Sequence, residues 1–160
     1  MSEALKTMFL MMLFGFILML QYNIDADRTS TRQLKNTLEL ALHDASLSLD
    51  ETQLSRGKIV FDQGKADEKL KESLSYHLGL TKGLIPVKNS FYQHPFQIKS
   101  IEYIDEKKNK FPMDYKNPKY NIVNRLNGPA IIAVIETKSP RYFRGEGITI
   151  TQAAVYEYKP

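Results

Sequence analysis

The first 24 residues place the strongest constraint on how this chain folds. No residue in Thr7–Ile24 is charged, and Met8–Leu20 is almost entirely apolar. The uncharged run is 18 residues long, which falls within the range of about 17–25 that an α-helix needs to cross a bilayer. It reaches this length only when residues 21–23 lie at the membrane interface. Because the chain has no Trp, we expect the interfacial anchor to be Tyr22 or a neighbouring residue.

Three interpretations of this run compete. A cleaved secretory signal would explain the positive charge of Lys6 before the run, but no pair of small residues suited to cleavage follows it. A buried core helix would show a polar face, and none is present over more than three turns. We therefore favour an uncleaved, single-span anchor formed by residues 1–26.

The charges around the anchor bear on its orientation. Arg28, Arg32 and Lys35 follow the run, and a count of Lys and Arg alone would keep the C-terminal side inside. Long domains, however, cross the membrane largely regardless of flanking charge. We expect a single-pass protein of the cell membrane whose C-terminal domain is extracytoplasmic.

Residues 27–56 predict an amphipathic helix that continues the anchor. Its apolar residues recur at helical spacing; they are Leu34, Leu38, Ala41, Leu42, Ala45 and Leu49. No Gly or Pro occurs between residues 16 and 56, so the anchor and the extension are compatible with one helix of about 40 residues. The alternative is a new helix capped by the Asp, Ser and Thr residues of Asp27–Thr31. Gly57 supplies the stop.

The remainder, residues 57–160, predicts an α+β domain with a second helix and an antiparallel sheet of about four strands. The second helix covers Lys65–Leu80, with His77 on its apolar stripe. The expected strands are Lys58–Asp62, Gln97–Asp105 with a bulge near Ser100, Tyr120–Arg125, the apolar Ala130–Ile135 as central strand, and Ile148–Tyr158.

Catalytic chemistry has little support in the sequence. The chain has no Cys, which excludes disulfides, thiol catalysis and iron–sulfur clusters. It also has no glycine-rich phosphate loop, nucleophile elbow or HExxH motif. His43, His77 and His94 lie far apart along the chain, without a second ligand at a favourable spacing. We therefore predict a non-enzyme with no catalytic residue, cofactor or metal.

A basic segment interleaved with aromatic residues suggests a polyanion patch. Its members are Lys107, Lys108, Lys110, Lys116, Lys119, Arg141 and Arg144. Positive charge beside flat rings is what binding to a nucleic acid or a cell-wall polymer requires. The alternative is a loop whose aromatics cover the edge of the sheet while the lysines keep it soluble, and we favour that interpretation.

The plan of the chain resembles type IV pilin-like proteins. A helix that is apolar in its first half and amphipathic in its second precedes an antiparallel sheet, and Glu3 stands just ahead of Met8–Leu20. This start is similar to that of TadE-type pseudopilins. The resemblance implies that Glu3 pairs with the amine of a neighbouring subunit and that the apolar helices bundle. The residues that would make assembly contacts are Glu3, Phe9, Phe14, Leu34 and Leu38.

Two functional hypotheses follow. The first is a non-enzymatic, single-pass, pilin-like or envelope- and secretion-apparatus assembly component. Its partners would be the membrane and copies of itself or related subunits, contacted through the N-terminal helix. The second is a membrane-tethered binding module for an anionic partner, a nucleic acid or a cell-wall polymer, which would use the basic patch.

Overall fold

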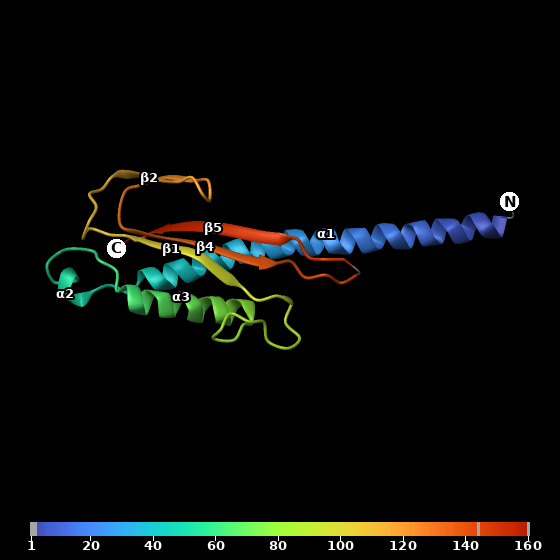
Figure 1. The fold of residues 1–160 in the computed structure, drawn as a ribbon, viewed down its shortest axis with the longest axis horizontal. Coiled ribbons are helices and arrows are strands. Elements are labelled where there is room, and N and C mark those ends of the chain that lie inside the picture. The colour runs from blue at the N-terminus through green and yellow to red at the C-terminus, as the bar shows by residue number, and fades with distance from the viewer. Residues whose placement is uncertain (1–2, 144, 160) are drawn as a thin grey trace.

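The computed structural model describes residues 3–143 and 145–159, and within them the chain is α+β (Figure 1). The helices are α1 (Glu3–Ser46), α2 (Glu51–Leu54) and α3 (Gln63–Leu78). The strands are β1 (Gln97–Ile104), β2 (Met113–Asn117), β3 (Ile122–Leu126), β4 (Ala130–Lys138) and β5 (Thr149–Glu157). The predicted fold class is confirmed.

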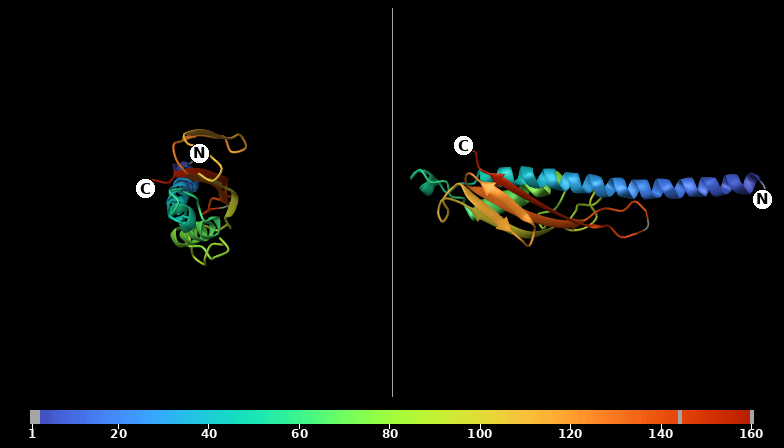
Figure 2. Two further views of the ribbon diagram at one scale, coloured as in Figure 1. Left: turned by 90° about the vertical axis from the view of Figure 1, so that its left-hand side faces the viewer. Right: turned by 90° about the horizontal axis from the view of Figure 1, so that it is seen from above.

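Helix α1 runs without a break from the apolar N-terminal segment into the domain (Figures 1 and 2). Its 44 residues correspond to a length of about 66 Å. No new helix starts at Asp27–Thr31, because the hydroxyls there serve the continuing helix. Ser30 donates to the carbonyl of Ala26, and Thr31 donates to that of Asp27. The single long helix is therefore the arrangement that forms.

The end of α1 differs from the sequence prediction. The helix stops at Ser46, ten residues before the expected residue 56. Asp50 accounts for the difference, because its carboxylate accepts hydrogen bonds from the backbone N–H groups of Thr52 and Gln53 and caps the separate helix α2. The expected strand Lys58–Asp62 is also replaced, by a single bridge between Leu49 and Phe61.

Helix α3 lies where the sequence predicts a second helix, but it begins at Gln63 and ends at Leu78, two residues before each expected bound. The side chain of Asp62 accepts a hydrogen bond from the N–H of Lys65, and Gly79 ends the helix in the left-handed conformation. Its buried residues are Ala66, Leu70, Ser73, Leu74 and Leu78. His77 is exposed rather than part of this stripe, which corrects the sequence prediction. The apolar residues pack against α1.

Strands β1, β4 and β5 form an antiparallel sheet in the order β1-β4-β5. The register of β1 against β4 shifts between Ile98 and Ser100, which is the bulge expected near Ser100. Strand β4 is central, as predicted for Ala130–Ile135, and all six of those residues are buried. A strand covered on both faces has no position at which a polar side chain is required.

The sheet count needs correction, because β2 and β3 form a separate two-stranded hairpin. The molecule therefore has three layers (Figure 2). Helices α1 and α3 share one core with Ile131, Ala133 and Ile135 of β4. The hairpin covers the opposite face, where Leu126 and Tyr115 pack against Ala130 and Ile132. Adding the hairpin to the three-stranded sheet would leave that second face of β4 exposed.

Candidate membrane anchor and its junction with the domain

The N-terminal part of α1 projects from the domain as an isolated apolar helix (Figures 1 and 2). Among its described residues, the first one that is buried is Ala26. The helix is long and apolar enough to cross a membrane, and none of its most apolar 18-residue window is buried. The large exposed apolar side chains of this segment include Met8, Phe9, Met11, Phe14, Phe16, Ile17 and Leu20.

The proposed assembly residues fall into two structurally different groups. Phe9 and Phe14 lie on the projecting segment and are more than half exposed. Leu34 and Leu38 are 0% and 1% exposed and pack in the domain's own core, so this structure leaves neither side chain at the surface for a contact with another subunit. Glu3 is exposed and forms an ion pair with Lys6 at 2.7 Å, one helical turn away.

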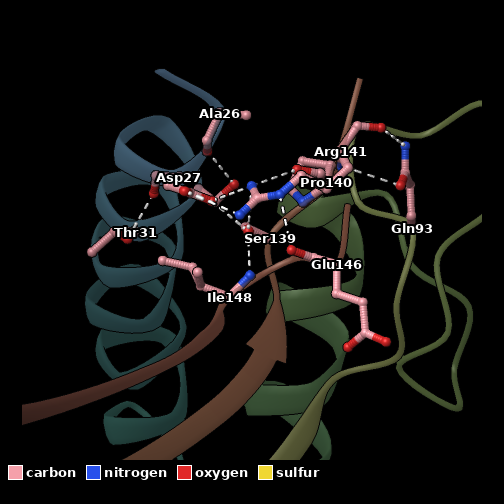
Figure 3. A network of polar contacts seen from close by, with 10 residues as sticks. Ala26, Asp27, Thr31, Gln93, Ser139, Pro140, Arg141, Glu146 and Ile148 are labelled. Atoms are coloured by element: carbon pink, nitrogen blue, oxygen red, sulfur yellow. Dashed lines mark hydrogen bonds and ion pairs between the residues drawn. The ribbon is translucent and has the colours of Figure 1, made fainter. Parts of the chain in front are cut away.

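Asp27 lies at the centre of a network of hydrogen bonds at the point where α1 enters the domain (Figure 3). The Nη1 and Nη2 atoms of Arg141 donate to the two carboxylate oxygens of Asp27, at 2.5 Å and 3.2 Å. The hydroxyl of the fully buried Ser139 donates to the same carboxylate at 2.5 Å. The side chains of Asp27 and Arg141 are only 21% and 14% exposed, so solvent screens this pair less than a surface salt bridge.

The electrostatics of Asp27 follow from this geometry. Burial acts to raise the pKa of the carboxyl group, but the hydrogen bonds from Arg141 and Ser139, together with the charge of Arg141, hold it below its usual value of 3.8. Asp27 is therefore ionised at neutral pH and forms a charge-assisted pair. The network ties the β4–β5 loop to the helix.

The same network reaches the loop that precedes β1. Gln93 exchanges two hydrogen bonds with the backbone of Arg141, both at 3.3 Å. Nearby, the phenol of Tyr92 donates to the carbonyl of Ser30 in α1 at 3.1 Å. Tyr92 is 2% exposed, and this burial raises its pKa far above the ordinary value. The loop before β1 and the β4–β5 loop therefore both form hydrogen bonds with α1 where the helix leaves the domain.

The residues of the polyanion patch are only partly brought together. Lys107, Lys108 and Lys110 lie in the β1–β2 connection, and Lys116 and Lys119 lie on the hairpin. All five are exposed, and none forms an ion pair with a residue that the structure describes. Lys119 stands over the ring of Tyr120 at 5.0 Å. Arg141 is bound to Asp27 in a loop at the opposite end of the sheet, which removes it from the patch, and Arg144 lies outside the described residues.

Other polar groups of the domain are engaged with one another. An open depression of about 520 Å³ between α1 and α3 is lined by Asp44, Lys69, Glu72, Ser73, Tyr76 and His77, among others. In it Lys69 pairs with Glu72, and Ser73 donates to Asp44. His43 is exposed, and its Nδ1 atom lies 2.6 Å from the hydroxyl of Tyr156. Within the described residues no three His, Asp or Glu side chains are grouped as metal ligands.

No protein-family model matches the chain, and neither a curated protein nor a solved structure shows significant similarity to it.

The contact between Asp27 and Arg141 where α1 enters the domain was not predicted from the sequence. Asp27 and Arg141 are 114 positions apart, and no local spacing links two residues at that separation. Tyr92 was not predicted to contact α1 either, because an aromatic residue in a loop indicates no particular partner.

Proposed function

We propose that this chain is a non-enzymatic, single-pass membrane protein whose α1 helix anchors an extracytoplasmic α+β domain, and that it serves as a pilin-like or envelope-assembly component. One observation carries the proposal: none of the most apolar 18-residue window of α1 is buried, and the same helix continues into a half that is packed in the domain's core. An exposed apolar surface of this size marks a site of interaction with a membrane or another protein.

The continuity of α1 favours an anchor with a mechanical role. Because the helix has no break at Asp27–Thr31, the apolar segment has a fixed direction relative to the sheet. A flexible linker would leave the domain free to tumble. A rigid helix instead places every copy of the domain in the same orientation, which is what ordered assembly requires.

Membrane insertion and orientation are tested together on the full chain. Because the protein has no Cys, Val123→Cys introduces a single thiol on β3 at a position that is 70% exposed. We expect the protein to remain in membranes after alkaline carbonate treatment and this thiol to react with a membrane-impermeant maleimide in intact cells. Leu13→Cys is the control within the anchor and should react only after solubilisation. Release by carbonate would contradict anchoring, and labelling of the β3 thiol only in broken cells would reverse the orientation.

Assembly through the helix needs a separate test. Single Cys substitutions of Phe9 or Phe14 should form disulfide-linked dimers in membranes under mild oxidation, because both side chains are exposed on the projecting segment. Leu34→Cys is the matched control, since that position is buried in the domain's own core. A monomeric product for both anchor variants would contradict the assembly role while leaving the anchor intact.

The five exposed lysines of the β1–β2 connection and the hairpin favour a second candidate function, the binding of an anionic polymer. Lys107→Glu combined with Lys116→Glu should abolish retention of a fluorescent single-stranded oligonucleotide or of purified cell-wall polymer. The affinity of the natural sequence should fall steeply with salt. Lys65→Glu on α3 is the control, because Lys65 already pairs with Asp62. Binding that is absent or insensitive to salt would exclude this function.

A further inference from the structure

The β4–β5 loop extends from the end of the sheet beside α1, toward the projecting apolar segment (Figure 2). The ring of Phe143 lies against the ring of Tyr22, with centroids 6.2 Å apart and planes tilted by 47°. Phe143 remains 37% exposed, and its neighbour Tyr142 is 59% exposed. The domain therefore presents two aromatic side chains beside the helix that would enter the membrane.

We propose that this loop is a second lipid contact, in which Tyr142 and Phe143 insert into the interfacial region of the leaflet from which α1 emerges. The inference rests on the proposed function, because it requires α1 to span the bilayer. It adds that the domain lies on the membrane surface instead of standing clear of it. The occupant of the aromatic surface is the phospholipid interface.

The depth of the loop follows from the length of the helix. The uncharged run Thr7–Ile24 extends about 26 Å along the helix axis, close to the hydrocarbon thickness of about 30 Å. Tyr22 is about 3 Å from the end of that run, which places it at the lipid–water boundary. Because Phe143 contacts Tyr22, it lies at the same depth. Tyr22 and Tyr142 carry the polar tip that suits an aromatic side chain to this region, and Phe143 adds an apolar ring.

The loop is also held in place, and the two cations Lys138 and Arg141 in its described part have acidic partners. Arg141 is bound to Asp27 of α1, and its Nε atom donates to the carbonyl of Glu146. The side chain of Lys138 lies 3.7 Å from that of Glu146. Since both of these cations have acidic partners, bringing the loop to the interface leaves neither charge unpaired. The fixed loop sets the distance between the domain and the membrane.

The absence of Trp from the chain makes a direct test available. Phe143→Trp and Tyr142→Trp each place a single tryptophan in the loop of the full-length protein and keep an aromatic ring there. Phe14→Trp is the reference within the anchor. Leu54→Trp is the control on α2, which Figure 1 places at the end of the domain farthest from the start of α1. Each variant is reconstituted in phosphatidylcholine vesicles that carry bromine near the start or near the end of the acyl chains.

We expect the tryptophans at positions 142 and 143 to emit at shorter wavelength in vesicles than in the protein unfolded by denaturant. Bromines near the start of the acyl chains should quench more than half of their fluorescence. The anchor reporter should be quenched by deep bromines, and the α2 reporter by neither. Quenching at residue 14 with none at residues 142 and 143 would overturn the lipid contact and leave the anchor standing. No quenching at residue 14 would overturn the anchor, and the lipid contact with it.

Discussion

Arg141 and Asp27, 114 positions apart in the sequence, form a two-pronged ion pair that fixes the β4–β5 loop to α1. The pair is mostly shielded from solvent, and it lies one residue beyond the first buried residue of the helix, Ala26. It therefore joins the sheet to α1 at the point where the projecting apolar segment leaves the domain. Its removal should loosen this connection more than the loss of an ordinary surface salt bridge would.

Asp27→Asn should lower the free energy of unfolding of the domain by about 2 kcal/mol, the range for hydrogen bonds to charged groups. The variant leaves Arg141 partly buried without a counter-charge. Urea unfolding of the full chain in mild detergent measures the change. Asp25→Asn is the control, because Asp25 is exposed and should change stability by less than about 0.5 kcal/mol. Equal stability of the two variants would show that the pair contributes nothing.

The contribution of Asp27 should also depend on pH. Burial raises the pKa of Asp27, but the contacts with Arg141 and Ser139 outweigh it, so the pKa in the folded state lies below 3.8. The folded state then binds the proton less tightly than the unfolded chain. The stabilisation is complete at pH values above the unfolded pKa of about 4 and is lost as the pH falls through the lower folded pKa.

The measurement for this pH dependence is the difference in urea midpoint between the natural sequence and Asp27→Asn. We expect a constant difference from neutral pH down to about 5, and a decrease below about 4. The comparison isolates Asp27 from other acids of lowered pKa, such as Glu136 and Asp62, because both proteins retain them. A difference that stayed constant into strong acid would contradict the assignment.

The sequence predicts those parts of the fold whose signal is local. The helical spacing of Leu34, Leu38 and Leu42 identified the buried face of α1, and the apolar run Ala130–Ile135 identified the central strand. The bulge near Ser100 was visible as a slip in the alternation. These features were predictable because one face of each element is buried and the period of burial follows from its geometry.

Features that depend on distant contacts were not predictable. The apolar spacing predicted one helix that extends past Leu49. In the structure the side chain of Asp50 caps the separate helix α2 instead. Strand β2 was not expected, and the separation of β2 and β3 from the main sheet was not predictable, because alternation does not show which face each strand covers. The Asp27–Arg141 pair has no local signature. The helical spacing correctly predicted that Leu34 is buried. It did not show whether the same domain or a neighbouring subunit covers this side chain.

Leu34→Ala and Leu38→Ala distinguish a core role from an assembly role. Each should destabilise the domain by about 3 kcal/mol, because both side chains are fully enclosed by the domain's own core. Leu40→Ala, on the exposed side of the same helix, should cost less than about 0.5 kcal/mol. Urea unfolding provides the measurement. Natural stability combined with reduced crosslinking through residue 9 or 14 would instead restore the assembly assignment.

Two glycine substitutions should have opposite effects. A Cβ atom added at Gly147 would lie 2.0 Å from the backbone carbonyl oxygen of Ser139, so Gly147→Ala must shift the backbone that holds the Ser139 hydroxyl on Asp27. We expect a loss of about 2 kcal/mol, typical of overpacking. At Gly64 in α3 the nearest atom would be 3.6 Å away, an ordinary contact. Gly64→Ala should therefore stabilise by about 0.5 kcal/mol through lower entropy of the unfolded chain. An unfolding midpoint that did not fall for Gly147→Ala would contradict the close approach at the junction, and one that fell for Gly64→Ala would contradict the entropic gain in α3.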